Sequence, residues 1–152
     1  MSSPTTKQEW IALKETLTFQ DQAWIDGKWC KAISGSTYPV SNPATGEVLA
    51  QMAACQSEDV ELAVAAARRT FDKGVWSQQQ PSARKEVLKK LADLIRENLE
   101  ELALLETLNT GKPISDSMNV DIPGSAGCIE WYAEAIDKLY GEVAPTDVNN
   151  IA

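Results

Sequence analysis

The chain has 152 residues, of which 43% are hydrophobic, and a formal net charge of −8 from 22 acidic and 14 basic side chains. That length supports one domain with one core, and the acidic balance argues against a nucleic-acid partner, whose phosphates it would repel. The complete absence of histidine excludes histidine-based catalytic triads and histidine-ligated zinc sites.

The three cysteines, Cys30, Cys55 and Cys128, are odd in number and form no C-x-x-C pair. They therefore indicate neither a disulfide framework nor a thiolate metal cluster. The N-terminus lacks the basic start and apolar run of a secretion signal, and no stretch approaches the apolar length of a membrane span. These features predict a cytoplasmic protein with no membrane partner.

The first elements predicted along the chain are a short helix and a tight β-hairpin. Thr6 and Glu9 have the spacing of a capping box at the start of an amphipathic helix. Further on, short apolar runs flank the pair Asp26-Gly27, which supplies the positive φ angles that a two-residue hairpin turn needs.

A second pair of strands is expected at residues 37–40 and 48–53, joined by the polar turn of residues 42–47. Residues 23–55 are therefore predicted to be β-structure with little core of its own. Short strands of this kind need helices or further sheet to cover one face. A layer of helices is expected to follow.

Two amphipathic helices come next, with Ser57 expected to cap the first and Ser82 the second, and with Gly74 ending the first. Apolar residues at helical spacing predict an inward face on each helix. These faces consist of Val60, Ala63, Val64, Ala67 and Phe71 on the first helix and Val87, Leu88, Leu91, Leu94 and Ile95 on the second. Basic and acidic residues alternate on the second helix, which favours a solvated face over a nucleic-acid site.

The third helix ends abruptly. Leu102, Leu105 and Leu108 recur at helical spacing, Gly111 can take the left-handed conformation that closes a helix, and Pro113 prevents its continuation.

A fourth helix is predicted to begin near Asp121, with Pro123 in its first turn, and to end at Gly141. Its core face is expected to comprise Ile129, Tyr132, Ala133, Ile136 and Leu139. Gly124 and Gly127 inside it each cost about 1 kcal/mol relative to alanine. That cost indicates close approach by another element or room for a ligand.

None of the common catalytic motifs is complete. Thr110-Gly111-Lys112 resembles the end of a phosphate loop, but Glu106 occupies the required upstream glycine position. The lone G-x-x-G at residues 124–127 does not make a dinucleotide fingerprint. No histidine exists to activate Cys128, so a core thiol is favoured over a nucleophile. The motifs alone describe a non-catalytic α/β module.

The order of the elements and several motifs nevertheless resemble the N-terminal portion of an aldehyde dehydrogenase, from Trp24 to Asp147. The motifs are WIDGKW at 24–29, SNPATGEV at 41–48, SEDV at 57–60, LADLI at 91–95, LETLNTGKP at 105–113 and WYA at 131–133. Residues 121–124 and 131–144 look most like the members that oxidise γ-aminated aldehydes from polyamine breakdown. Those members include γ-glutamyl-γ-aminobutyraldehyde and 4-guanidinobutyraldehyde dehydrogenases.

The resemblance implies an α/β fold in which residues 1–152 form the N-terminal part of the cofactor-binding domain, without its Rossmann-like sheet. The implied division is an N-terminal helix at 1–22, short strands at 23–56, helices at 57–142 and the start of the next extended segment at 143–152.

The family oxidises aldehydes to carboxylates with NAD or NADP, through a cysteine thiohemiacetal, hydride transfer and glutamate-assisted hydrolysis of a thioester. The family contexts that carry this chemistry are G-Q-x-C, E-L-G-G-K, P-W-N-F-P and F-T-G-S, and none occurs here. We therefore expect no catalytic or cofactor-binding residue in this chain and no activity from it alone. The complete protein is expected to take a small-molecule aldehyde and to form a dimer or tetramer.

Two supporting sites are also implied by the resemblance. A monovalent cation, K⁺ or Na⁺, is held in many relatives at positions that correspond to Val40, Ser41 and Asn109. Relatives often have Asp where Asn109 stands, so cation binding is expected to be weaker here. A polar turn docked onto a helix end explains the same residues equally well.

The second implied site is the wall of the aldehyde tunnel, formed in the family by the fourth helix. Val120 and Gly124 correspond to tunnel positions, and Cys128 and Trp131 are expected on the same side. Glycine at 124 is predicted to widen the opening for a long polar aldehyde.

Three interpretations remain open on the sequence. The favoured one is the N-terminal part of an aldehyde dehydrogenase. The second is a stand-alone interaction module derived from that family, and the third is a small enzyme built around Cys128. Under the first, apolar helix faces should remain exposed for want of the sheet that covers them.

Overall fold

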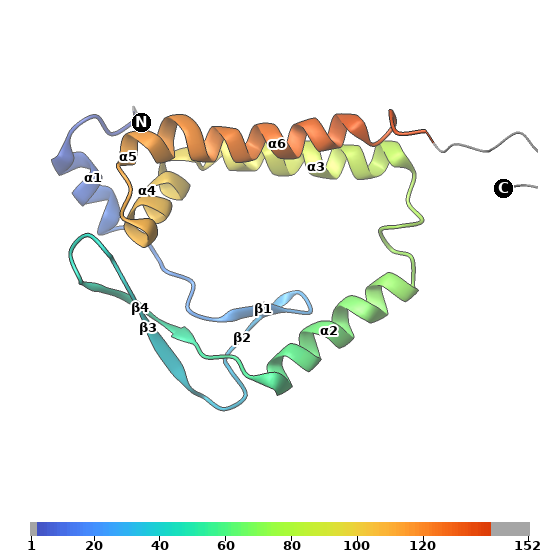
Figure 1. The fold of residues 1–152 in the computed structure, drawn as a ribbon, viewed down its shortest axis with the longest axis horizontal. Helices are drawn as coiled ribbons and strands as arrows, with labels where there is room; N and C mark the ends of the chain where they lie inside the picture. The colour runs from blue at the N-terminus through green and yellow to red at the C-terminus, as the bar shows by residue number, and fades with distance from the viewer. Residues whose placement is uncertain (1–2, 141–152) are drawn as a thin grey trace, which may run out of the picture.

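The computed structural model describes residues 3–140, and its elements follow the predicted order of a helix, two hairpins and a series of helices (Figure 1). The elements are α1 (Lys7–Lys14), β1 (Ala23–Ile25), β2 (Lys28–Cys30), β3 (Thr37–Ser41), β4 (Val48–Ala53), α2 (Ser57–Asp72), α3 (Pro81–Glu97), α4 (Leu99–Thr110), α5 (Ile114–Asp116), the π-helical segment η1 (Ser117–Asp121) and α6 (Ile122–Ala135). Figure 1 shows α3 and α6 side by side along one edge, with the hairpins and α2 on the opposite side.

The capping box of α1 is confirmed. The amide of Glu9 donates to the Thr6 hydroxyl at 3.3 Å, and the amide of Thr6 donates to the Glu9 carboxylate at 2.8 Å. Hydrogen bonds from the amides of Thr5 and Thr6 lower the pKa of Glu9 to about 2. The charge of that carboxylate also suits the positive end of the helix.

The first hairpin forms as its turn residues predict. Asp26 and Gly27 both have positive φ angles, 53° and 77°, and β1 pairs antiparallel with β2. Trp24 and Trp29 lie opposite each other in this ladder, with ring centroids 4.8 Å apart in an edge-on arrangement. The pair stiffens a hairpin that has few other apolar contacts.

The second hairpin, β3 and β4, brings a polar turn against the end of α4. Its register breaks between Val40 and Ser41. Asn42 is buried, and its side chain accepts a hydrogen bond from the amide of Ala44. A Cβ atom on Gly111, the C-cap of α4, would lie 2.9 Å from the ring of Pro43. The predicted helix stop is therefore also a docking point for this turn.

The N-terminal ends of α2 and α3 differ from the prediction by one or two residues. Gln56, not Ser57, is the N-cap of α2, and Gln80, not Ser82, is the N-cap of α3. Asp59 explains the first difference because its carboxylate accepts the amide of Gln56 at 2.9 Å and that of Ile33 at 2.9 Å. A residue three positions into the helix thus performs the capping and anchors a loop as well.

The packed centre of the helical layer is made largely of alanine. Ala92 of α3 and Ala126 and Ala133 of α6 are 0% exposed. Side chains this small allow the two helices to approach closely. The buried apolar set among the described residues is Ala32, Ala92, Ala103, Leu104, Leu108, Ala126 and Ala133.

Much of the predicted inward face of the helices is exposed, so that prediction is wrong for these side chains. They are Val60, Ala63, Val64, Ala67 and Phe71 of α2, Val87, Leu91 and Leu94 of α3, and Tyr132 and Leu139 from the fourth predicted helix. Helical periodicity identifies an apolar face, but it does not supply the element that covers it. The expectation that large apolar faces remain uncovered is confirmed. Within residues 3–140, no helix combines the length and apolarity that a bilayer crossing requires.

The fourth predicted helix is α6, which begins at Ile122 directly after its N-cap Asp121, as predicted. Helical structure starts at Ile114, directly after Pro113, and passes through η1 into α6. Pro123 lies in the first turn of α6, as predicted, and the helical residues 114–121 before it were not predicted. Regular α-helix ends at Ala135, six residues before the predicted end, so the helix is shorter than predicted. Gly141 itself lies outside the described residues.

Candidate functional site

Two of the three residues predicted to hold a cation meet at one cavity. Val40, near the end of β3, and Asn109, in the last turn of α4, both line a cavity of about 680 Å³. Ser41 is exposed and is not among the lining residues. The amide oxygen of Asn109 is of the hard type that Na⁺ and K⁺ prefer, and so are backbone carbonyl oxygens.

Acidic side chains also border this cavity. Glu101 and Glu106 line it, and the carboxylate of Glu106 lies 3.2 Å from the ammonium group of Lys112. Within the described part of the chain, no group of three or more His, Cys, Asp or Glu side chains is arranged to hold a metal ion. A cation in this cavity would be coordinated by neutral oxygens, with the carboxylates of Glu101 and Glu106 nearby.

The residues predicted to wall a tunnel share one exposed side of the fourth helical stretch. Gly124, Cys128 and Trp131 follow at spacings of four and three residues, which places them on one face of α6. Val120 lies four residues earlier, inside η1, and is 65% exposed. No heavy atom lies within 4 Å of where a Cβ on Gly124 would sit, so this face has space at that position.

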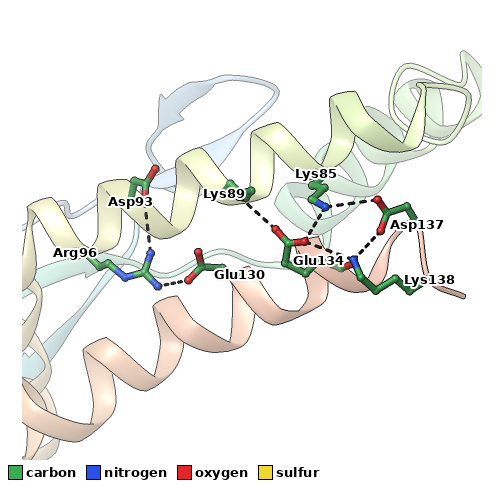
Figure 2. A network of polar contacts seen from close by, with 8 residues as sticks. All are labelled: Lys85, Lys89, Asp93, Arg96, Glu130, Glu134, Asp137 and Lys138. Atoms are coloured by element: carbon green, nitrogen blue, oxygen red, sulfur yellow. Dashed lines mark hydrogen bonds and ion pairs between the residues drawn. The ribbon is translucent and has the colours of Figure 1, made fainter.

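A neighbouring side of α6 is held against α3 by ion pairs (Figure 2). The ammonium group of Lys85 lies 2.7 Å from the carboxylate of Glu134, and that of Lys89 lies 3.2 Å from it. Arg96 pairs with Glu130 further along the two helices. Hydrogen bonds from Lys85 and then Lys89 lower the pKa of Glu134 to about 2.

The π-helical segment η1 precedes the exposed face of α6, and sequence reasoning missed it. The amide of Ile122 donates to the carbonyl of Ser117, five residues back, instead of the usual four. Proline at 123 is the feature that could have indicated it, because it has no amide to donate to Asn119 and its ring crowds that carbonyl.

Both ends of η1 are tied to α4 and its cap. The hydroxyl of Ser117, which is 0% exposed, lies 2.9 Å from the hydroxyl of Thr107. At the other end, the ammonium group of Lys112 lies 2.8 Å from the carboxylate of Asp121 and 3.2 Å from that of Glu106. The sequence placed Lys112 in an incomplete phosphate loop and in the family motif at 105–113, but it did not predict these contacts.

The match to known proteins settles the class to which this fold and these motifs belong. Residues 29–152 match the aldehyde dehydrogenase family. The chain belongs to that family.

Three individual relatives show how similar the chain is to known members and how much of each member it covers. The chain is 45% identical to an aminoacetaldehyde dehydrogenase of Pseudomonas aeruginosa over 95% of its own length and 29% of the relative's. It is 48% identical to the NADP/NAD-dependent aldehyde dehydrogenase PuuC of Escherichia coli over 90% of its length and 28% of that protein's. The crystal structure of a γ-glutamyl-γ-aminobutyraldehyde dehydrogenase from Burkholderia cenocepacia aligns with a TM-score of 0.90 at 52% identity, over 92% of this chain and 28% of that one. The chain thus spans less than a third of the length of these relatives.

Proposed function

We propose that the complete protein oxidises an aldehyde to a carboxylate with NAD⁺ or NADP⁺, and that residues 1–152 are the N-terminal part of its cofactor-binding domain. The family membership of the chain carries this proposal. NAD(P)⁺ accepts the hydride in this chemistry. The residues of this chain contribute scaffold and a wall for the substrate, because the family's nucleophile, base and cofactor motifs lie elsewhere.

The proposed substrates are aldehydes that carry an amino, γ-glutamylamino or guanidino group. The names of the relatives support this range, since they include an aminoacetaldehyde dehydrogenase and a γ-glutamyl-γ-aminobutyraldehyde dehydrogenase. The test is to assay the complete enzyme with γ-glutamyl-γ-aminobutyraldehyde, 4-guanidinobutyraldehyde, aminoacetaldehyde and propanal. A kcat/KM for propanal above all three would contradict the proposal.

Within that enzyme, we assign the exposed side of Val120, Gly124, Cys128 and Trp131 to the aldehyde tunnel. The uncovered space beside Gly124 supports this assignment, since a long substrate needs room along the wall. Gly124→Met in the complete enzyme should lower kcat/KM for a long amino aldehyde by about tenfold or more and that for propanal much less.

Ser125→Met is the matched control for this substitution. It adds a side chain of the same final size one residue away, on a different exposed side of α6. It should leave the ratio of the two kcat/KM values unchanged. Equal losses on long and short aldehydes in Gly124→Met would remove Gly124 as a determinant of substrate size.

The cation site is proposed at Val40, Ser41 and Asn109, where K⁺ or Na⁺ would stabilise the junction between β3 and α4. The shared cavity of Val40 and Asn109 supports it. The Tm of the complete protein should rise in KCl or NaCl relative to choline chloride at equal ionic strength. Asn109→Asp should enlarge that difference by adding a charged ligand, and Asn109→Ala should reduce it. Identical melting in all three salts would leave the docked polar turn as the sole role of these residues.

The alternative, a stand-alone interaction module derived from the family, makes a different prediction about the native product. Intact mass of that product distinguishes the two, because the relatives are more than three times as long as this chain. Light scattering on the same sample tests the proposed dimer or tetramer.

A further inference from the structure

The cavity that Val40 and Asn109 share has two acidic residues in its wall, and they lie at different distances from Asn109. Glu106 precedes Asn109 by three residues on α4, about one helical turn or 4.5 Å along the axis, so the two side chains are neighbours. Glu101 precedes it by eight residues, which corresponds to about 12 Å along the axis. Of the two carboxylates, that of Glu106 is therefore the one placed to act beside the amide of Asn109.

The carboxylate of Glu106 is engaged through one of its two oxygens. Its Oε1 lies 3.2 Å from Nζ of Lys112, and no hydrogen bond to its Oε2 is made by residues 3–140. Lys112 is not among the residues that line the cavity, so its ammonium group holds Glu106 from outside. The same ammonium group lies 2.8 Å from the carboxylate of Asp121. This arrangement leaves one oxygen of Glu106 for a second cation.

The surroundings of this pair determine how strongly its charges act. The side chains of Glu106 and Lys112 are each 34% exposed, so water and salt screen them only in part. Apolar side chains such as Leu102 and Leu105 line the same cavity, and electrostatic interactions are stronger beside an apolar wall than in open water. Hydrogen bonds to Asp121 and then Glu106 raise the pKa of Lys112 above the ordinary value of 10.5, so the lysine is charged throughout the neutral range.

We propose that Glu106 supplies the negative charge that Asn109 lacks at the cation cavity, and that Lys112 competes with K⁺ or Na⁺ for this carboxylate. The inference rests on the proposed function, because it requires a cation at Val40, Ser41 and Asn109. A carboxylate oxygen is a hard ligand that suits both ions. Asn109 then acts as a neutral oxygen ligand, and the ion pair between Glu106 and Lys112 sets the affinity for the cation.

The test measures the Kd for K⁺ of the complete protein from the rise of its Tm with KCl, with choline chloride keeping the ionic strength constant. Each variant is compared with its own Tm in choline chloride, so a general loss of stability does not change the Kd. Glu106→Gln should raise the Kd by about fivefold, because it removes the charge beside the cation. Lys112→Met should lower the Kd by about threefold, because it releases the carboxylate. Lys112→Arg keeps the competing charge and should stay near the wild type.

The variant that carries both Glu106→Gln and Lys112→Met shows whether the lysine acts through Glu106. Its Kd should equal that of Glu106→Gln alone, because no carboxylate is left to release. If Lys112→Met lowers the Kd by the same factor with and without Glu106, the lysine only repels the cation at a distance, and the proposed competition is wrong.

Two further variants are controls of matched charge. Glu101→Gln removes the other carboxylate of the cavity wall, and Lys85→Met removes a lysine that pairs with Glu134 on the helix pair α3 and α6. Both should keep the Kd of the wild type. A rise in Glu101→Gln equal to that in Glu106→Gln would overturn the inference, because it would indicate a general effect of net charge.

Asn109→Ala separates this inference from the cation site on which it depends. If KCl stabilises the wild type and Asn109→Ala weakens that effect while Glu106→Gln does not, the cation site stands and only the role of Glu106 is wrong. If KCl and NaCl stabilise the wild type no more than choline chloride does, the cation site fails, and this inference fails with it. Lys112→Gln replaces Lys112→Met if the latter does not fold, with the same expected fall in Kd.

Discussion

Lys85 of α3 and Glu134 of α6 are joined by an ion pair with 2.7 Å between nitrogen and oxygen. Glu134 also accepts from Lys89, and Lys138, in the turn that follows α6, lies 3.5 Å from it (Figure 2). Three ammonium groups therefore surround one carboxylate. This arrangement makes Glu134 the most heavily shared acidic group between the two helices.

The first prediction concerns the acid stability of that contact. The pKa of Glu134 is lowered from 4.5 to about 2 by its lysine partners, so its stabilising effect is complete above pH 4.5 and disappears as the pH falls towards 2. Glu134→Gln should lower the Tm of the complete protein at pH 7. The difference in Tm between the two proteins should shrink between pH 4.5 and pH 2.

The same difference should diminish in high salt, because Glu134 is partly exposed and its partners are screened by ions. Asp93→Asn is the comparison, since Asp93 pairs with Arg96 within one helix only. A pH-independent difference between wild type and Glu134→Gln would show that the lysine contacts do not stabilise the fold.

The second prediction concerns Asp59, which is 3% exposed and accepts two backbone amides. Asp59→Ala leaves the amides of Ile33 and Gln56 without this acceptor and should reduce the free energy of unfolding by about 3 kcal/mol. Glu58→Ala, on the exposed neighbour in the same helical turn, should cost less than about 1 kcal/mol. The midpoints of urea unfolding of the two complete proteins provide the comparison, and equal midpoints would contradict the anchoring role of Asp59.

The third prediction separates backbone conformation from packing at two glycines. Gly111 and Gly46 have nearly the same φ angles, 78° and 76°, but only Gly111 has a neighbour, Pro43, where a Cβ would project. Both alanine substitutions should destabilise by about 1 kcal/mol for the left-handed backbone. Gly111→Ala should lose a further ~1 kcal/mol or more through the contact with Pro43. Equal losses in urea unfolding would mean that the polar turn does not dock tightly onto α4.

The fourth prediction concerns residues 1–152 expressed alone. Phe71 and Val64 of α2 are 66% and 59% exposed, and similar apolar side chains continue along α3. This polypeptide should bind a hydrophobic dye, aggregate at micromolar concentrations and give no NADH with any aldehyde. The complete protein is the control. A soluble, dye-negative monomer with a cooperative melt would instead favour the stand-alone module.

Local sequence chemistry predicted the parts of this fold that depend on a few adjacent residues. The Asp26-Gly27 turn, the capping box at Thr6 and the left-handed cap at Gly111 are confirmed because neighbouring groups alone determine them. The burial of Val60 and Tyr132 was predicted wrongly, because burial depends on distant elements that periodicity does not reveal.

The candidate site also has features that the local sequence predicts and features that depend on distant elements. The shared face of Gly124, Cys128 and Trp131 follows from helical spacing, so it could be predicted. The π-turn could not, because it depends jointly on Pro123 and on contacts from α4. Lys112 was missed for a related reason: its partner Asp121 lies nine residues away, across a helix end, and no periodic pattern joins them.

The alanines between α3 and α6 have a further consequence for how the complete protein assembles. Alanine has no side-chain rotamers to lose, so packing α3 against α6 through these residues costs almost no side-chain entropy. The ion pairs from Lys85, Lys89 and Arg96 to α6 then align the two helices. The packed pair of α3 and α6 can therefore offer its exposed side to the rest of the enzyme as a preformed, rigid surface.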